Sequence, residues 1–279
     1  MLRIEDLDRA RCKREYVAQV LRDLEWVGIV WDNDVSDPMY HQSHRQHLYL
    51  EAWRLLYEKG YLYPSRHSRK DVERCLSAPH ESEEGAEPVF PTELRPAYMQ
   101  DGATVGRGNN LFLPADLRHL TSPSVQASGT ANWRFRVPDG QKVEFVDGNY
   151  GPVSYTAGVD FGDFLVWRAD DTASYELAVV VDNLEMGITE VVRGQDLLLS
   201  TARQLLLMDV LCQSSAAVGK RSKPAFFHCP LVLDKDGKRM AKRCASNTLQ
   251  GLREAGVSPT QLSELFHLAP CQMPAQFVD

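Results

Sequence analysis

Residues 226–243 read FFHCPLVLDKDGKRMAKR, and the fold of the chain is decided by this stretch. Its apolar first half, residues 226–233, has the length of one buried strand. Residues 234–237 (DKDG) then predict a tight turn, because aspartate favours the start of a turn and glycine accepts a positive φ. Four cations follow on the loop behind the turn: Lys238, Arg239, Lys242 and Arg243. Such a loop can close over a polyphosphate, although an exposed hairpin tip made basic for solubility is the simpler alternative.

Length and composition place the chain among ordinary globular proteins. It has 279 residues, 43% of them hydrophobic and 25% charged, and can bury one large core or two. No apolar run approaches the ~18 residues of a membrane span, and the N-terminus does not have the pattern of a signal peptide. The six cysteines form no CxxC pair, so we expect reduced thiols in a cytoplasmic protein. The net charge of −7 requires that any RNA partner be held by local basic patches.

Two amphipathic helices are expected before residue 60. Apolar side chains at helical spacing predict a helix over residues 11–27, ended by Gly28, and another over residues 43–57, ended by Gly60. Three histidines near the start of the second helix are spaced three apart: His41, His44 and His47. They could share a helical face, but no carboxylate or thiolate completes a metal site, so surface histidines are the simpler interpretation.

The hydrophobic pattern changes to a period of two between residues 133 and 168. Residues 133–137 and 142–147 alternate on either side of Pro-Asp-Gly and predict a β-hairpin, and residues 163–168 predict a further strand. Residues 77–91 are acidic and rich in Ser, Gly and Pro, which indicates a flexible excursion. These elements together predict a mixed α/β insert.

The second half of the chain returns to alternating helices and strands. A helix is expected from Tyr175, a buried β-branched strand over residues 188–192 and a long helix over residues 197–211. Arg193 ends the strand, at the edge where parallel sheets bind ligands. By its residue type alone, Tyr175 is better explained as a core tyrosine.

Three ordered motifs resemble the glutamyl branch of the class I aminoacyl-tRNA synthetases. Residues 239–243 (RMAKR) fill the five positions of the second signature loop of this class, K-M-S-K-S or K-L-S-K-R. Residues 175–204 carry YELAVVVDN, MGITEVVRGQDL and STARQ, and residues 2–8 read LRIEDLD; both stretches are similar to segments of the glutamyl branch. The resemblance extends over nearly the whole chain.

The resemblance implies an α/β fold, a Rossmann-like class I synthetase catalytic domain. This domain would consist of residues 1–60 and 171–279, with the signature loop at 234–243. A mixed α/β subdomain resembling the acceptor-stem-binding part of the family would be inserted at residues 61–170. The family opens with a β-α unit that carries an ATP-binding H-I-G-H-like motif. This chain begins at the next strand, so that first unit is expected to be missing.

The resemblance also implies roles for particular residues. Lys242 would be the catalytic residue that steadies the phosphates of ATP, with Mg²⁺, and the rest of its loop would also bind ATP: Arg239, Met240, Ala241 and Arg243. Glu5 would hold the α-amino group of glutamate and Tyr175 would contact the substrate. Arg193 would grip the γ-carboxylate of glutamate with its two-pronged guanidinium.

In the resembling family a zinc ion stabilises the insert. The four matching positions here are Ser65, His67, Phe90 and Leu94. At most His67 could bind a metal, and one ligand does not make a tetrahedral site. We therefore expect no zinc and no metal site formed by the protein.

Three features point to a short branch of the family, the glutamyl-queuosine tRNA(Asp) synthetases: Val179, the chain length and the remnant of the zinc insert. Val179 stands where full-length members carry asparagine, and Asp279 ends the chain where those members continue into a helical anticodon-binding region. The resemblance implies a monomeric ligase that forms glutamyl-adenylate from glutamate and ATP and transfers the glutamyl group to the queuosine of tRNA(Asp). The alternatives are a truncated glutamyl-tRNA synthetase core and a non-catalytic RNA- or glutamate-binding paralogue without the H-I-G-H-like motif.

Overall fold

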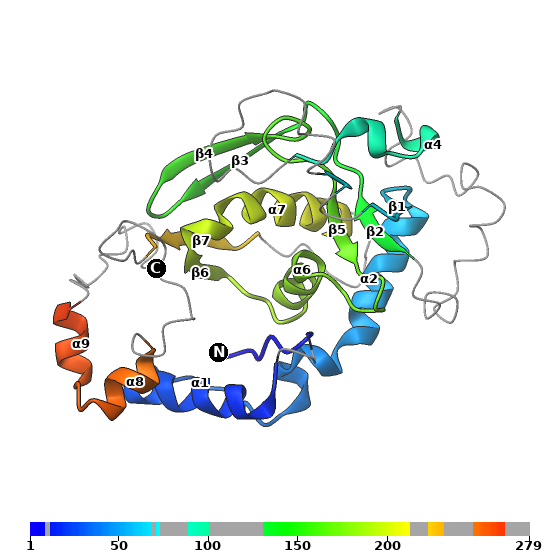
Figure 1. The fold of residues 1–279 in the computed structure, drawn as a ribbon. Helices are drawn as coiled ribbons and strands as arrows, with labels where there is room; N and C mark the ends of the chain where they lie inside the picture. Colours follow the sequence, from blue (N-terminus) through cyan, green and yellow to red (C-terminus); the bar gives the residue numbers. More distant parts are fainter. Residues whose placement is uncertain are drawn as a thin grey trace. The chain divides into compact units, whose positions relative to one another are not determined.

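The computed structural model describes residues 1–8, 12–67, 71–72, 89–100, 131–212, 223–231 and 248–265 (Figure 1). The chain forms two compact units, one of residues 1–45 with 229–279 and one of residues 46–228. The signature loop at 234–243 lies outside the described residues, as does most of the acidic stretch 77–91. None of the described helices combines the length and the apolar composition needed to cross a membrane.

In the first unit, the main helix is α1 (Arg14–Trp26), which begins three residues later than the sequence predicts. Gly28 ends it as expected, with a φ of 83° that a side chain would disfavour. The N–H of Gly28 donates to the carbonyl of Glu25 at 3.0 Å, and the N–H of Ile29 donates to that of Leu24 at 2.9 Å. The sequence therefore predicted the end of this helix correctly.

Shorter elements complete the first unit. Two 3₁₀ turns follow, η1 (Pro38–Tyr40) and η2 (Gln42–His44), and η2 occupies the start of the predicted second helix. The N-terminal stretch pairs beside them, with the N–H of Ile4 donating to the carbonyl of Tyr40 at 2.8 Å. Near the C-terminus lie α8 (Leu249–Glu254) and α9 (Pro259–Leu265). The Oγ of Ser258 accepts a hydrogen bond from the N–H of Gln261 at 3.2 Å, so it caps α9.

The second unit contains two sheets. The first is antiparallel, in the order β1 (Leu62–Ser65), β2 (Asn132–Phe135), β5 (Phe164–Trp167). The second has the order β4 (Gly151–Thr156), β3 (Lys142–Asp147), β7 (Ala225–Cys229), β6 (Glu190–Gly194). In this sheet β3 and β4 form an antiparallel hairpin, whereas β3 and β7 run parallel.

The predicted hairpin of residues 133–137 with 142–147 is wrong. β2 pairs with β1 and β5, while β3 pairs with β4 and β7. The turn between them donates its backbone N–H groups to segments further along the chain: that of Val137 to the carboxylate of Asp163 at 3.0 Å, and that of Gly140 to the carbonyl of Ala157 at 2.8 Å. Alternation marks both strands correctly, but it does not specify which strand each one pairs with.

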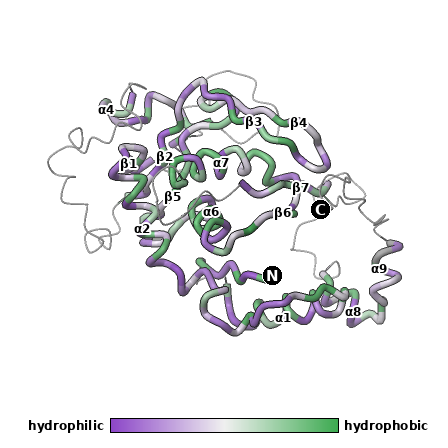
Figure 2. The backbone as a smooth tube through the Cα atoms, turned by 180° about the vertical axis from the view of Figure 1, so that it is seen from behind, coloured by the Kyte–Doolittle hydropathy of each residue, from purple (hydrophilic) through white to green (hydrophobic). Residues whose placement is uncertain are grey.

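The helices of the second unit are α2 (Gln46–Glu58), α4 (Ala97–Gln100), α6 (Tyr175–Glu185) and α7 (Leu198–Cys212), with 3₁₀ turns η3 (Thr92–Leu94) and η7 (Gln195–Leu197). α6 and α7 carry long hydrophobic stretches (Figure 2). Eleven of the fifteen residues of α7 are buried, so it is a core helix that packs against α6 and β3. The Oγ of Ser174 caps α6 by accepting from the N–H of Leu177 at 3.3 Å.

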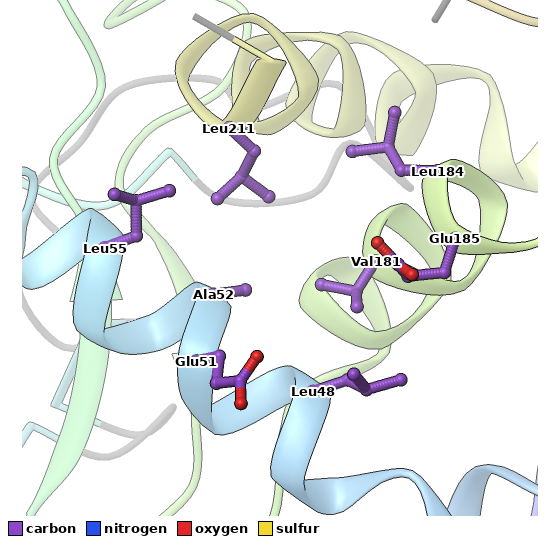
Figure 3. Close-up of a pocket in the computed structure, with 8 residues that line it drawn as sticks. All are labelled: Leu48, Glu51, Ala52, Leu55, Val181, Leu184, Glu185 and Leu211. Carbon is purple, nitrogen blue, oxygen red and sulfur yellow. The ribbon is translucent and has the colours of Figure 1, made fainter. Parts of the chain in front are cut away.

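An apolar pocket of about 150 Å³ lies between α2, α6 and α7 (Figure 3). The side chain of Ala52 points into it from α2 and leaves the space that a larger residue would fill. Its lining consists of aliphatic side chains and two carboxylates: Leu48, Glu51, Ala52, Leu55, Val181, Leu184, Glu185 and Leu211.

The strand that carries Arg193 differs from its prediction in position and in burial. β6 spans Glu190–Gly194 rather than residues 188–192, and Val192 is 62% exposed. Ile188 lies in the turn that closes the end of α6, since its N–H donates to the carbonyl of Asn183 at 2.9 Å. Within the described part of the chain, β6 forms the edge of its sheet, which explains why its valines are not buried on both faces.

Candidate active site

Arg193 is half-buried at the end of β6, and its guanidinium contacts side chains from two other elements. Its Nη2 donates to Oγ1 of Thr201, on α7, at 2.7 Å, and its Nε donates to Nε2 of His228, on β7, at 3.2 Å. One edge of the planar guanidinium is therefore held by acceptors of the protein. The other edge has two N–H groups side by side, a geometry that matches a carboxylate.

Tyr175 lies beside the outward edge of this guanidinium. Nη1 of Arg193 donates to the hydroxyl of Tyr175 at 3.5 Å. Tyr175 begins α6 and is 37% exposed, so its hydroxyl can both accept from Arg193 and contact a bound molecule. The two residues together form a polar corner with a fixed cation.

His228 and Asp147 lie behind Arg193 and are almost completely buried, with exposed fractions of 0% and 1%. Nδ1 of His228 is 2.6 Å from Oδ2 of Asp147. Since Asp147 can only accept, the proton lies on Nδ1 and Nε2 keeps its lone pair for Arg193. Burial by itself raises the pKa of Asp147, but hydrogen bonds from His228 and from backbone N–H groups outweigh it and hold the pKa below its usual value.

The carboxylate of Asp147 is anchored by the turn that follows β3. Its Oδ1 accepts from the backbone N–H groups of Asn149 at 3.0 Å and Tyr150 at 3.1 Å. Gly148, which precedes Asn149, lets this turn approach β7 closely, because a Cβ there would lie 2.7 Å from the ring of Phe227. The N–H of Gly148 donates to the carbonyl of Phe226 at 2.8 Å, which joins the turn to β7.

Glu176 is a second buried carboxyl near the site. It follows Tyr175 on α6, and its Oε2 accepts from Nε2 of Gln204 at 2.8 Å. Nη1 of Arg203 lies 3.9 Å from its other oxygen. Burial raises the pKa of Glu176, in opposition to Arg203 and the hydrogen bonds. This side chain joins α6 to α7.

Comparison with known proteins identifies the family. The model of the catalytic domain of class I tRNA synthetases for glutamate and glutamine (E and Q) matches residues 1–94 and 114–276. The chain belongs to this family. Its Rossmann-like class I fold is thereby confirmed, and so is its membership of the ATP-dependent tRNA ligases.

Similar sequences in this synthetase family include two from the short branch. The glutamyl-Q tRNA(Asp) synthetase of Symbiobacterium thermophilum is 40% identical over 278 residues, which are 96% of this chain and 76% of that protein. The one from Rhodopirellula baltica is 38% identical over 93% of this chain and 71% of its own length. Glutamate–tRNA ligase 1 of Methylococcus capsulatus is 34% identical over 93% of this chain, which spans half of that protein.

Solved structures of the same synthetase family share the fold. A crystal structure of a glutamate tRNA ligase from Elizabethkingia meningosepticum, in complex with its amino acid, aligns with a TM-score of 0.62 and 24% identity. It covers 87% of this chain, which spans 45% of that ligase. The glutamate tRNA synthetase of Elizabethkingia anophelis aligns equally well.

The structure brings together two of the synthetase residues predicted from sequence, Tyr175 and Arg193. Glu5 belongs to the first unit, where its exposed carboxylate accepts from Arg3 at 2.9 Å, and its role stays a prediction. All residues assigned to ATP lie outside the described residues: Arg239, Met240, Ala241, Lys242 and Arg243.

Sequence reasoning missed three residues behind Arg193. In the sequence, His228 is only one residue of an apolar strand, and Thr201 is only one residue of a motif. A polar residue inside a buried strand needs a partner, and Asp147 ends the alternating strand β3 that lies beside β7. This pattern could have suggested the pair, provided that β3 had been assigned to the sheet of β7.

The four positions matched to the zinc ligands of the synthetase family are occupied by packed side chains. Ser65 accepts from Nε of Arg134 at 3.4 Å, and the ring of His67 lies 6.5 Å from that of Phe90. Phe90 and Leu94 belong to a hydrophobic cluster with Tyr63, Val72, Met99 and Tyr98. Across the described ranges, no group of three or more His, Cys, Asp or Glu residues gathers as metal ligands.

Beside this cluster, Arg95 joins two aspartates. Its Nε donates to Asp163 at 2.7 Å and its Nη1 donates to Asp139, also at 2.7 Å. The hydroxyl of Tyr63 donates to the same oxygen of Asp163 at 2.7 Å. The network links β1, the turn after β2 and the start of β5, so it ties this part of the insert together.

Proposed function

We propose that this chain activates glutamate with ATP and transfers the glutamyl group to the queuosine of tRNA(Asp). The observation that carries the proposal is the outward edge of Arg193, held in place beside Tyr175. A planar pair of N–H donors fits a side-chain carboxylate, and glutamate supplies one. The similarity to glutamyl-Q tRNA(Asp) synthetases over more than nine tenths of the chain supports the same substrate.

In the first step, the α-carboxylate of glutamate would attack the α-phosphate of ATP and release pyrophosphate. Arg193 and Tyr175 would bind the far end of the amino acid, which orients the α-carboxylate for this attack. Glu5 would hold the α-ammonium group by a charge-assisted hydrogen bond. Lys242 and its loop, together with Mg²⁺ that accompanies the nucleotide, would stabilise charge on the phosphates.

In the second step, a hydroxyl of queuosine would take the glutamyl group from the adenylate and release AMP. The insert, residues 61–170, would provide the surface for the RNA. Because the proposed acceptor is tRNA, the protein would act in the cytoplasm. We further propose that it acts as a monomer, which size-exclusion chromatography with light scattering would test.

The second candidate is transfer to the 3′ end of tRNA(Glu), which the similarity to glutamate–tRNA ligases favours. Val179, buried on α6, favours the queuosine reading through the family resemblance. Radiolabelled glutamate should be offered with ATP and three RNAs: tRNA(Asp) with queuosine, tRNA(Asp) without it, and tRNA(Glu). Each RNA should be tested intact and after removal of its 3′ CCA.

Queuosine transfer predicts label on modified tRNA(Asp) only, unaffected by removal of CCA. Transfer to a 3′ end predicts label that disappears with the CCA. If no RNA is labelled while glutamate and RNA still bind, the chain is a non-catalytic paralogue. Each outcome therefore selects one of the three functions.

A further inference from the structure

We infer that His228 and Asp147 are positioning residues that fix the guanidinium of Arg193 for its ligand. The inference rests on the proposed function, in which that ligand is the side-chain carboxylate of glutamate. A hydrogen-bonded chain runs from Asp147 at the end of β3, through His228 on β7, to Arg193 on β6. Three neighbouring strand ends are thereby connected behind one cation.

Asp147 fixes the tautomer of His228. Its Nδ1 faces a carboxylate at 2.6 Å, so Nδ1 carries the proton and Nε2 is the acceptor. In the opposite tautomer, an N–H would point at Nε–H of Arg193, only 3.2 Å away, and no acceptor would remain. Asp147 thus determines which face His228 offers to Arg193.

The residues behind the guanidinium of Arg193 are rigidly held. Asp147 cannot easily turn, because its Oδ1 accepts from the backbone N–H groups of Asn149, Tyr150 and His228 itself, at 3.0, 3.1 and 3.3 Å. The Oγ1 of Thr201 lies 3.1 Å from Nε2 of His228 and accepts from Arg193. The three polar side chains behind the guanidinium, those of Asp147, Thr201 and His228, are buried, and each has hydrogen-bond partners.

The consequence is a preorganised cation. With Nε and one N–H of Nη2 held from behind, the guanidinium cannot rotate, and the edge facing Tyr175 stays available. Without the acceptor at His228, Arg193 gains rotational freedom that binding has to remove. The loss should appear in the affinity for glutamate, not in the affinity for ATP.

Two substitutions separate the contacts of His228. In His228→Asn the shorter amide can still donate to Asp147 but cannot reach Arg193. In His228→Gln the amide oxygen can lie where Nε2 lay and accept from Arg193. Tyr49→Phe is the matched control for the cost of a lost buried hydrogen bond, because Tyr49 donates to Asp182 at 3.0 Å elsewhere in the second unit.

Glutamate and ATP affinities of the full chain should be measured by calorimetry, with the melting temperature alongside. We expect roughly ten-fold weaker glutamate binding for His228→Asn, the effect of one hydrogen bond to a charged group. His228→Gln should recover most of the affinity, and ATP affinity should be unchanged throughout. Tyr49→Phe should lower the melting temperature without weakening glutamate binding.

Nitrogen-15 NMR of the histidines gives a readout that a merely structural role would not move. At neutral pH we expect His228 to carry its proton on Nδ1, in contrast to the Nε2 form common for free histidine. A proton on Nε2, or wild-type glutamate affinity in His228→Asn, would overturn the inference and leave the proposed function standing. If the wild-type chain binds no glutamate, the proposed function itself fails.

Discussion

At the scale of single residues, the site depends on the shape of arginine as much as on its charge. The guanidinium of Arg193 donates from one edge to Thr201 and His228. In the proposed function, its other edge binds the side-chain carboxylate of glutamate. A lysine has one ammonium group and no edges, so it cannot satisfy both sides at once. The same reasoning explains why burial of His228 and Asp147 is tolerated, since each satisfies the other.

We therefore expect Arg193→Lys to weaken glutamate binding by roughly ten- to a hundred-fold, the range for a hydrogen bond of about 1.5–3 kcal/mol to a charged group. ATP affinity should hardly change. Both are measured by calorimetry, with Arg168→Lys as the control, because Arg168 pairs with Asp170 at an exposed position. Unchanged glutamate affinity in Arg193→Lys would show that Arg193 does not bind the side chain of glutamate.

A second prediction at this scale concerns acid stability. Burial by itself raises the pKa of Asp139, but hydrogen bonds from Arg95 and Arg136 outweigh it and hold the pKa below its ordinary value. The unfolded chain therefore binds a proton at a higher pH than the folded chain. The stabilisation is present above the unfolded pKa of ~3.9 and is lost as pH falls through the folded value.

Melting temperatures measured from pH 7 to pH 3 should test this. Asp139→Asn should melt lower than wild type at pH 7, and the difference should shrink as the pH falls below about 4. Asp170→Asn is the control, because its exposed pair with Arg168 contributes little. A difference that stays constant with pH would show that the charge of Asp139 does not stabilise the fold.

At the scale of elements, periodicity predicted helices and strands well but not their partners. The helices α1, α6 and α7 lie within a few residues of their predicted ranges, because capping residues and apolar spacing are local signals. The pairing of β2 and β3 is decided by contacts with distant segments, such as that between Val137 and Asp163. Motifs in the sequence predicted Tyr175 and Arg193 as site residues. Predicting His228 and Asp147 would have required knowledge of which strands are neighbours in the sheet.

The pocket between α2, α6 and α7 offers a test at this scale. Ala52→Leu should fill part of its about 150 Å³ with apolar atoms and raise the free energy of unfolding by about 1 kcal/mol. Denaturant unfolding would measure the change. Ala18→Leu on α1 adds the same atoms at an exposed helical position and should have no comparable effect. A lower stability of Ala52→Leu would mean that the pocket is too narrow for the added groups.

At the scale of the whole molecule, the chain consists of two units, and the first of them is built from two segments that are distant in sequence. The family resemblance supplied the class of fold, which neither composition nor periodicity could distinguish from other α/β proteins. It also led to the expectation about zinc. At the corresponding positions the structure has a hydrophobic cluster and the Arg95 network, both of which link segments that are distant in the chain.

Metal removal should accordingly leave the molecule intact. We expect no stoichiometric zinc in the purified protein, because Ser65, Phe90 and Leu94 cannot replace thiolates. Its melting temperature should be the same before and after treatment with EDTA. Elemental analysis and calorimetry would measure both, and one tightly held zinc per chain, or a lower melting temperature after chelation, would contradict the prediction.

The three backbone N–H groups that converge on Asp147 provide a natural reporter of the site. Tyr150 has a side chain that is 42% exposed, yet its N–H donates to a carboxylate held in a buried network. Its amide should therefore exchange with deuterium far more slowly than those of other exposed turns, although no ladder of strand hydrogen bonds protects it. Measuring amide exchange at single-residue resolution would give the exchange rate of Tyr150. That rate would report how often the site opens when no ligand is bound.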